Sequence, residues 1–281
     1  MARILVCAVM VAQVALIYRL QLRIDGLRAH LPAGYEVLYL PTGKHIQLLS
    51  FGYQQLLADV IYLWSIQYTG DTEAPDRFAR VEHMYTVISD LDPNYVDPYQ
   101  VGAMMMVYEM GDLSMAFHTL DRGIKNLPNN WQIPVDAGFY AFIEARNYDL
   151  AIHYFRIASE RPGAPGVVRR MLADMYRRKG DLATAVAFWE ELYRSAPDAD
   201  SRRIAYNHYF DLTQVLHVKI LRQAIDAYSA VYGHRPARLS RLVDAGLLRE
   251  LPRNLEGSEY LYDPRTGEVK APAPFKLNRR E

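Results

Sequence analysis

The sequence contains a single cysteine, Cys7, among its 281 residues, which excludes an internal disulfide framework and a thiolate metal cluster. It also carries no excess of charge, because 32 basic residues balance 32 acidic ones. A nucleic-acid-binding protein usually has a basic excess, so this balance argues against that class. Hydrophobic residues make up 51% of the chain, which indicates a folded rather than a disordered protein.

The motifs of common enzyme classes are also missing. The eight histidines are scattered without an H-E-x-x-H pair, and neither G-x-S-x-G nor G-x-G-x-x-G occurs. Residues 42–44 (TGK) end like a phosphate-binding loop but lack its upstream glycine. Segment 90–97 carries acidic residues like a calcium loop, but Tyr95 stands where that loop requires glycine, so turn formation and helix capping explain it better. We therefore expect no catalytic, cofactor or metal site, and we favour a non-enzymatic protein.

One long apolar run lies at the N-terminus. Ile4–Tyr18 is interrupted only by Gln13, and Arg19 and Arg23 follow it. As a helix this run is about 22 Å long, somewhat shorter than a bilayer core of about 30 Å, and the arginines could snorkel to the headgroups. The run predicts a signal-anchor transmembrane helix over 1–24 and a linker over 25–45. A cleaved signal and a buried helix are the alternatives, although no good small-residue cleavage site follows the run.

The orientation of this anchor rests on two opposing tendencies. Basic residues slightly favour the C-terminal flank of the run, which by the positive-inside rule argues for a cytoplasmic body. A single N-terminal anchor more often exports the large domain behind it. We favour an extracytoplasmic (periplasmic) domain.

A repeat of 34 to 35 residues organises the middle of the chain. Prolines fall at Pro93, Pro128, Pro162 and Pro197, in steps of 35, 34 and 35 residues. The sequence GDLSMA at 111–116 recurs as GDLATA at 180–185, with RNYDLA at 146–151 between them. A small residue at the close crossing of two helices, glycine after the first helix and proline after the second make a helix-pair repeat.

This pattern resembles the tetratricopeptide repeat family. In the best copy, 166–197, Leu172, Ala173 and Tyr176 match the first helix of the family motif, and Ala185 and Trp189 match the second. The copy ending at Pro128 departs from the motif, since it has Val107 where an aromatic residue is expected. The resemblance implies an all-α solenoid with about four helix pairs over 46–199.

The units flanking the repeats are less regular. Upstream, an apolar helix over Ile46–Tyr68 is expected to pair with a second helix over Phe78–Leu91. Downstream, capping helices are expected over 200–233, with one or two helices in Ser201–Gly233. The C-terminal part, 234–281, predicts a short helix over Arg238–Leu248 and a β-hairpin whose strands are 259–263 and 268–270. About 45 residues of this end are similar to some pseudopilin-like secretion proteins, which implies kinship with an envelope apparatus.

Protein binding is the function that these features favour. In the tetratricopeptide family, the first helices of the units line a concave groove, where tyrosine and methionine suit the capture of a peptide or helix. We expect a membrane-anchored scaffold for protein–protein interaction in assembly of a cell-envelope complex, with an integral accessory subunit of a larger membrane complex as the alternative. Packing of the same side chains against a capping helix is the other interpretation of the groove. The resemblance places these residues in it: Val101, Met105, Tyr108, Glu109, Ile133, Asp136, Tyr140, Ile143, Glu144, Arg170, Asp174, Arg177 and Arg178.

Overall fold

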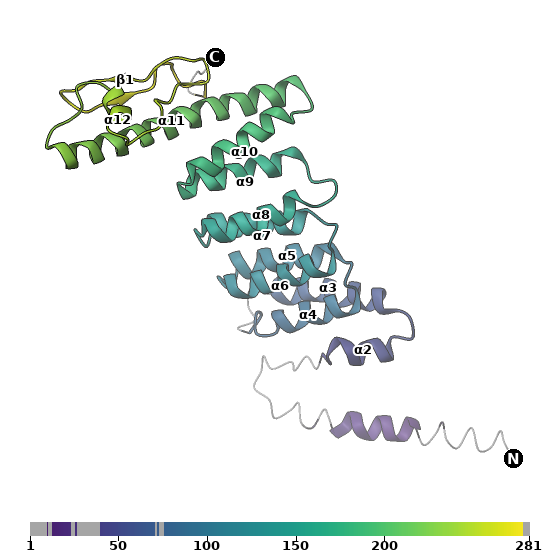
Figure 1. Cartoon of the computed structure of the whole chain (residues 1–281). Helices are drawn as coiled ribbons and strands as arrows, with labels where there is room; N and C mark the ends of the chain where they lie inside the picture. The colour runs from purple at the N-terminus through teal and green to yellow at the C-terminus, as the bar shows by residue number, and fades with distance from the viewer. Residues whose placement is uncertain are drawn as a thin grey trace. The chain divides into compact units, whose positions relative to one another are not determined.

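The computed structural model describes residue 10 and residues 13–23, 26, 40–70, 72 and 76–277. Within these residues the protein is mostly α-helical and has one two-stranded sheet (Figure 1), in agreement with the predicted all-α class. The helices are α2 (Gly43–Leu49), α3 (Gln54–Gly70), α4 (Val81–Leu91), α5 (Val96–Tyr108), α6 (Leu113–Asn126), α7 (Gln132–Ile143), α8 (Tyr148–Ser159), α9 (Gly166–Lys179), α10 (Leu182–Arg194), α11 (Ala199–Tyr232) and α12 (Ser240–Asp244), and the strands are β1 (Leu261–Tyr262) and β2 (Val269–Lys270).

The chain forms two compact units, Met1–Thr119 (unit 1) and Leu120–Glu281 (unit 2), whose boundary lies within α6. In unit 1, α2 and α3 pack on α4, and α4 packs on α5. In unit 2, each helix from α7 to α11 packs on the next one along the chain, and Figure 1 shows these helices in successive layers. Packing between neighbours in sequence is what a helical repeat requires.

The prediction of one continuous helix over Ile46–Tyr68 is wrong. The structure has α2, which ends at Leu49, and α3, which begins at Gln54. Between them, Phe51 and Gly52 have φ angles of 49° and 95°. Positive φ ends a right-handed helix, and glycine reaches this region at little steric cost.

Other predicted segments keep their place but change their limits. Helix α4 begins at Val81 rather than at residue 78, because turns occupy 76–80. The segment after Pro197 is one long helix, α11, which is one of the two alternatives expected for 201–233. The predicted helix over 238–248 is reduced to the five residues of α12.

Glycines end the first helices of two repeats as predicted. Gly111 and Gly180 have φ angles of 69° and 89°, and the amide of Gly180 donates to the carbonyl of Arg177. The second helices then begin at side-chain caps: Asn147 Oδ1 accepts from the Leu150 amide, and Asp181 Oδ1 accepts from the Thr184 amide. These local signals define the turns without help from distant residues.

Two close helix crossings depend on glycine. A Cβ atom on Gly102 of α5 would lie 2.6 Å from the Tyr85 ring of α4, and one on Gly138 of α7 would lie 2.8 Å from the Phe155 ring of α8. Gly102, Gly138 and Ala173 follow at steps of 36 and 35 residues (138 − 102 and 173 − 138). The repeat therefore places a small side chain where a large ring must pack.

The C-terminal end of α6 is closed by an arginine from the following repeat. The guanidinium of Arg161 donates to the backbone carbonyls of Ile124 and Asn130 at 2.9 and 3.0 Å, and also to that of Leu127. The last carbonyls of a helix have no partner within it, and this side chain satisfies that of Ile124. The carbonyls of Leu127 and Asn130 belong to the turn that follows the helix. Burial lowers the pKa of Arg161 from its ordinary value.

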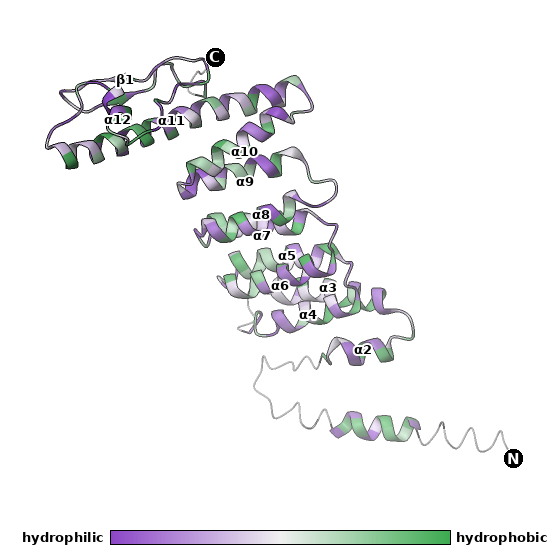
Figure 2. Ribbon diagram, in the orientation of Figure 1, coloured by the Kyte–Doolittle hydropathy of each residue, from purple (hydrophilic) through white to green (hydrophobic). Residues whose placement is uncertain are grey.

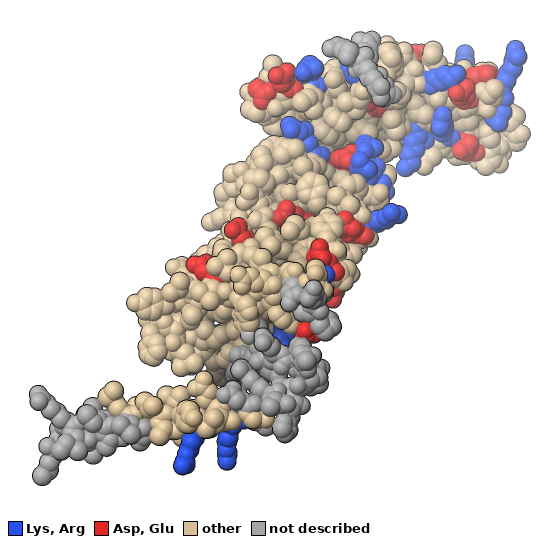
Figure 3. All heavy atoms as spheres, turned by 180° about the vertical axis from the view of Figure 1, so that it is seen from behind, with Lys and Arg blue, Asp and Glu red and all other residues tan. Residues whose placement is uncertain are grey.

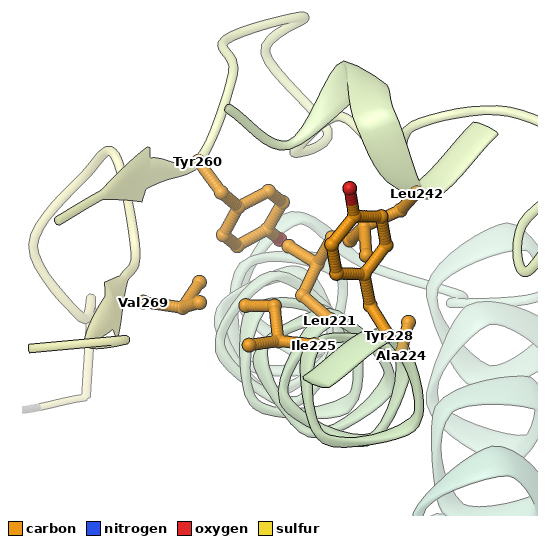
Figure 4. Close-up of a cluster of buried hydrophobic side chains, with 7 residues drawn as sticks. All are labelled: Leu221, Ala224, Ile225, Tyr228, Leu242, Tyr260 and Val269. Carbon is orange, nitrogen blue, oxygen red and sulfur yellow. The ribbon is translucent and has the colours of Figure 1, made fainter. Parts of the chain in front are cut away.

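The segment after α11 folds back over that helix. Leu221, Ala224, Ile225 and Tyr228 of α11 form a buried cluster with Leu242 of α12 and with Tyr260 and Val269 of the hairpin (Figure 4). The hairpin is antiparallel, with Leu261 opposite Lys270 and Tyr262 opposite Val269, so it lies where the sequence predicts it. This segment covers apolar surface that a terminal helix would otherwise expose.

The tail beyond the hairpin is held by a buried carboxylate. Asp211 is only 5% exposed, and its two oxygens accept from the amides of Lys276 and Leu277 at 2.7 and 2.9 Å. The Lys276 ammonium lies 4.1 Å from the Phe210 ring centroid and 3.0 Å from Glu256 Oε1. The side chains of α11 thus fix the tail through its backbone and its charge.

Half of the predicted anchor, 1–24, and much of the linker, 25–45, lie outside the described residues. Residues 13–23 are helical, and Val14, Leu16, Ile17 and Tyr18 are exposed there. Among the helices that the structure describes, none combines the length and apolarity needed to cross a bilayer.

Candidate protein-binding surfaces

The predicted groove residues of unit 1 all lie on α5 or directly after it. Val101 and Met105 are half-buried, whereas Tyr108 is 60% exposed at the last turn of the helix. Glu109 caps the helix, and its Oε2 lies 3.5 Å from Nη2 of Arg77. Tyr108 and Glu109 are therefore accessible to a partner, while Val101 and Met105 pack mainly within unit 1.

The remaining groove residues belong to unit 2. On α7, Ile133 is buried, Asp136 and Tyr140 are half-buried, and Ile143 is 53% exposed, with Glu144 capping the helix. On α9, Arg170, Asp174 and Arg177 are half-buried and Arg178 is exposed. Burial of Ile133 removes it from the candidate surface, because a residue inside the helix pair cannot contact a partner.

The charged residues of α9 form one cluster instead of independent groove positions. Arg177 Nε lies 2.7 Å from Oδ1 of Asp174, and Arg178 Nε lies 2.6 Å from Oδ2. Burial opposes ionisation of Asp174, but hydrogen bonds and charge from Arg178 and Arg177 outweigh it and lower the pKa of this carboxyl. Two cations share one anion, so the cluster presents a net positive surface.

The same cluster connects α9 with α7. The guanidinium carbon of Arg178 lies 4.9 Å from the centroid of the Phe142 ring, in the geometry of a cation–π contact. The neighbouring Lys179 ammonium pairs with Asp149 at the start of α8. Aromatic and basic groups are thereby combined on one surface of unit 2, and α7, α8 and α9 all contribute to it.

His208 of α11 interacts electrostatically with Arg170, Asp174 and Arg177 of α9, and the sequence analysis did not identify it. Its ring stacks on Trp189 of α10, with centroids 4.0 Å apart and planes at 10°. It stands 35 residues after Ala173 (208 − 173), at the register position that carries a small residue in earlier units. The repeat register could therefore have pointed to it, because a ring at that position must stack on the facing aromatic side chain.

The pKa of His208 is lowered, primarily by burial. The charges of Arg177 and Arg170 act in the same direction, whereas those of Asp174 and Asp211 oppose them. These couplings identify Arg170, Asp174 and Arg177 as the groups of α9 that act electrostatically on α11.

We expect the contribution of His208 to the free energy of unfolding to be constant above about pH 6.5 and to fall below it, because folded His208 binds a proton less readily than the unfolded chain does. Chemical denaturation at several pH values measures this. The variant His208→Gln should show a smaller fall on acidification, although His217, whose pKa burial also lowers, still contributes. An equal fall on acidification in the native chain and in His208→Gln would contradict the prediction.

A cleft of about 700 Å³ lies between α11 and the segment after β1. Val218 and Arg222 of α11 line it together with Lys270 and Phe275. No sequence motif marks this cleft, because its walls come from residues about 50 positions apart that only the folded C-terminal segment brings together.

Within the residues that the structure describes, no three histidine, cysteine, aspartate or glutamate side chains are grouped as metal ligands. The acidic segment 90–97 comprises the end of α4, a turn at 92–95 and the start of α5, and Asp92 Oδ1 accepts from the Asn94 amide at 3.0 Å within the turn. The chain matches no protein-family model, and no curated protein matches its sequence.

Proposed function

We propose that the protein is a membrane-anchored scaffold of tetratricopeptide-like repeats that binds other proteins and serves in assembly of a cell-envelope complex. Its soluble part is placed outside the cytoplasm, in the periplasm, by the N-terminal anchor. The partner is a protein or peptide that contacts the first helices of the repeat units. No catalytic residue and no cofactor is assigned.

The aromatic and basic surface of unit 2 carries this proposal. Tyr140, Arg177 and Arg178 stand on the first helices of their pairs, and Arg178 extends along the Phe142 ring. Aromatic rings provide contact area at a low cost in conformational entropy, and arginine adds directed hydrogen bonds; both are enriched at protein interfaces. A peptide with acidic and apolar side chains matches this combination.

The alternative function is an integral accessory subunit of a larger membrane complex. The observation that favours it is the exposure of large apolar side chains on α2 and α3, such as Leu48 and Leu63, which are 80% and 62% exposed. Apolar surface of this extent marks a contact with another protein or with lipid. In this alternative, the first helices of the repeats do not select a separable partner.

A crosslinking pull-down from native membranes distinguishes the two functions. The full chain is compared with the variant Tyr108→Ala, Tyr140→Ala, Arg177→Ala and with a matched control, Tyr232→Ala, Arg194→Ala, Arg203→Ala, whose residues are exposed on other surfaces. We expect a defined partner to be recovered by the native chain and the control but lost with the first variant. Circular dichroism melting establishes that each variant is folded. Recovery of the same partner by all three chains contradicts the scaffold function and favours the subunit.

A further inference from the structure

Unit 1 exposes a continuous set of large apolar side chains on α2, α3 and the turn between them. Phe51 at the tip of this turn is 87% exposed, and Leu48, Leu49, Leu56, Val60 and Leu63 are each more than half exposed. We call these six residues the apolar face. Isolated apolar side chains are normal on a protein surface, but a contiguous group marks a binding surface.

Helix α3 is apolar on two opposite sides. Leu56, Val60 and Leu63, at spacing i, i+4, i+7, lie along its exposed side. Ala58 and Ile61 are buried on the opposite side, where α3 packs on α4. Within the described residues, one side of α3 is therefore buried against α4, and the opposite side remains more than half exposed.

The fold holds the apolar face in place. Gly43 of α2 fits so closely against α4 that a Cβ atom there would lie 2.3 Å from Cβ of Asp90. Nε2 of His83 lies 2.7 Å from the carbonyl oxygen of Leu40, just before α2. Both contacts fix α2 on α4, so Phe51 and its neighbours project from a defined turn.

Charge is sparse around the apolar face. The exposed charged residues of the two helices are Lys44 of α2 and Asp59 of α3. The Asp59 carboxylate accepts a hydrogen bond from Tyr95, which precedes α5. Figure 2 shows hydrophobic residues along α2 and α3, and Figure 3 shows that much of the visible surface of unit 1 is uncharged. A ligand of this face is therefore held by apolar contact rather than by charge.

We propose that the apolar face lies in the interfacial layer of a lipid bilayer, with Phe51 and the leucines among the upper acyl chains. This inference rests on the membrane anchoring proposed above. Seventeen residues separate Arg23 from Pro41, and they span at most about 60 Å when extended. An anchored N-terminal helix therefore limits the distance between the apolar face and the same membrane to about 60 Å.

A bilayer fits the exposed surfaces better than the chain's own N-terminal helix does. Val14, Leu16, Ile17 and Tyr18 are all exposed and, at successive helical positions, point to several sides of that helix. If it docked on the apolar face, only one of its sides would be covered. A bilayer covers the N-terminal helix and the apolar face together.

A protein partner fits the composition of the face less well than lipid does. Interfaces between proteins are enriched in tyrosine, methionine and arginine and contain directed hydrogen bonds. The apolar face consists of aliphatic side chains with one phenylalanine, as in helices that lie on membranes. The exposed Tyr53 beside it fits both kinds of partner, because tyrosine is enriched in protein interfaces and also at the membrane–water boundary. Because Lys44 is the one lysine or arginine on α2 and α3, binding is expected on neutral lipid and is expected to change little with salt.

The test uses the full chain with Cys7→Ser, reconstituted into phosphatidylcholine vesicles. Four variants, Ile17→Cys, Leu56→Cys, Leu63→Cys and Val231→Cys, each carry an environment-sensitive fluorophore, and the lipid carries a nitroxide at a shallow or a deep acyl position. We expect quenching at 56 and 63 several-fold above that at 231, an exposed apolar control on α11. Shallow nitroxides should quench more than deep ones, because interfacial helices reach only about 5–10 Å into the bilayer.

The probe at 17 separates this proposal from the anchoring on which it rests. Quenching at 17 without quenching at 56 and 63 overturns the lipid contact and leaves the anchor intact. Absence of quenching at all three positions overturns both. Probes at 56 and 63 that are shielded from water but not quenched by lipid nitroxides overturn the lipid contact in favour of the chain's own helix or of a second protein.

Discussion

Replacing Gly138 with valine is expected to destabilise unit 2 by about 2–3 kcal/mol, because extra side-chain volume in a packed core displaces its neighbours. Even the first carbon of the new side chain would meet the Phe155 ring at 2.8 Å. That ring is fully buried, so it has no free space to move into. Separation of α7 from α8 should also displace Tyr140 and Phe142, which lie on the same helix.

Denaturant unfolding measures this effect, and hydrogen exchange of the α7 and α8 amides localises it. The matched control is Gly166→Val at the start of α9, where an added Cβ meets no atom within 4 Å. That substitution should change the free energy of unfolding by less than about 0.5 kcal/mol. Equal decreases in the free energy of unfolding for the two substitutions would contradict the prediction. They would show that the packing of α7 on α8 does not require glycine at position 138.

Truncation of Leu221 to alanine is expected to cost about 3–4 kcal/mol, because a fully buried leucine loses its transfer free energy and leaves a cavity. Leu221 is 0% exposed in the cluster that joins α11 to α12 and the hairpin. The free energy of packing that is lost belongs to the contact between α11 and segment 234–277. Segment 234–277 should therefore loosen before the helices of the repeats do.

Limited trypsin digestion measures this local effect, since residues 235–265 carry several exposed arginines. Cleavage there should accelerate strongly in Leu221→Ala. Val231→Ala on the same helix, where the valine is 70% exposed, should leave both cleavage and stability close to those of the native chain. If Leu221→Ala unfolds the repeats and the C-terminal segment together, the segment is an integral part of the core of unit 2 instead of a separable cover.

Features encoded within a few residues were predicted correctly from the chain. The positive φ of Gly111 and Gly180 and the hairpin around residues 264–267 depend on local backbone preference and turn chemistry. The caps at Asn147 and Asp181 are equally local, but the sequence analysis did not name them. The sequence analysis did not predict that the helix ends at Phe51 and Gly52. Apolar residues continue at helical spacing across these positions, and a single glycine within such a pattern does not by itself indicate the end of a helix.

The candidate site was predicted only in part, for a different reason. The register of the repeats places Tyr140, Arg177 and Arg178 on first helices, but it does not indicate which side chains pair with each other. The sharing of Asp174 by two arginines and the stacking of His208 on Trp189 depend on rotamers and on neighbouring helices. The prediction that Ile133 contributes to the groove is wrong because that side chain is buried.

The amino-acid sequence alone determines that this protein is built from helix pairs of about 35 residues, because glycine, proline and cap residues act on the backbone locally. It also determines the balanced charge and the apolar N-terminal run. Tertiary structure decides which apolar side chains are covered: the C-terminal segment buries Leu221 and Tyr228 on α11, whereas Leu56 and Leu63 on α3 stay exposed. Burial depends on which distant segment folds back onto a helix, and hydrophobic contact is not directional, so no local pattern specifies it.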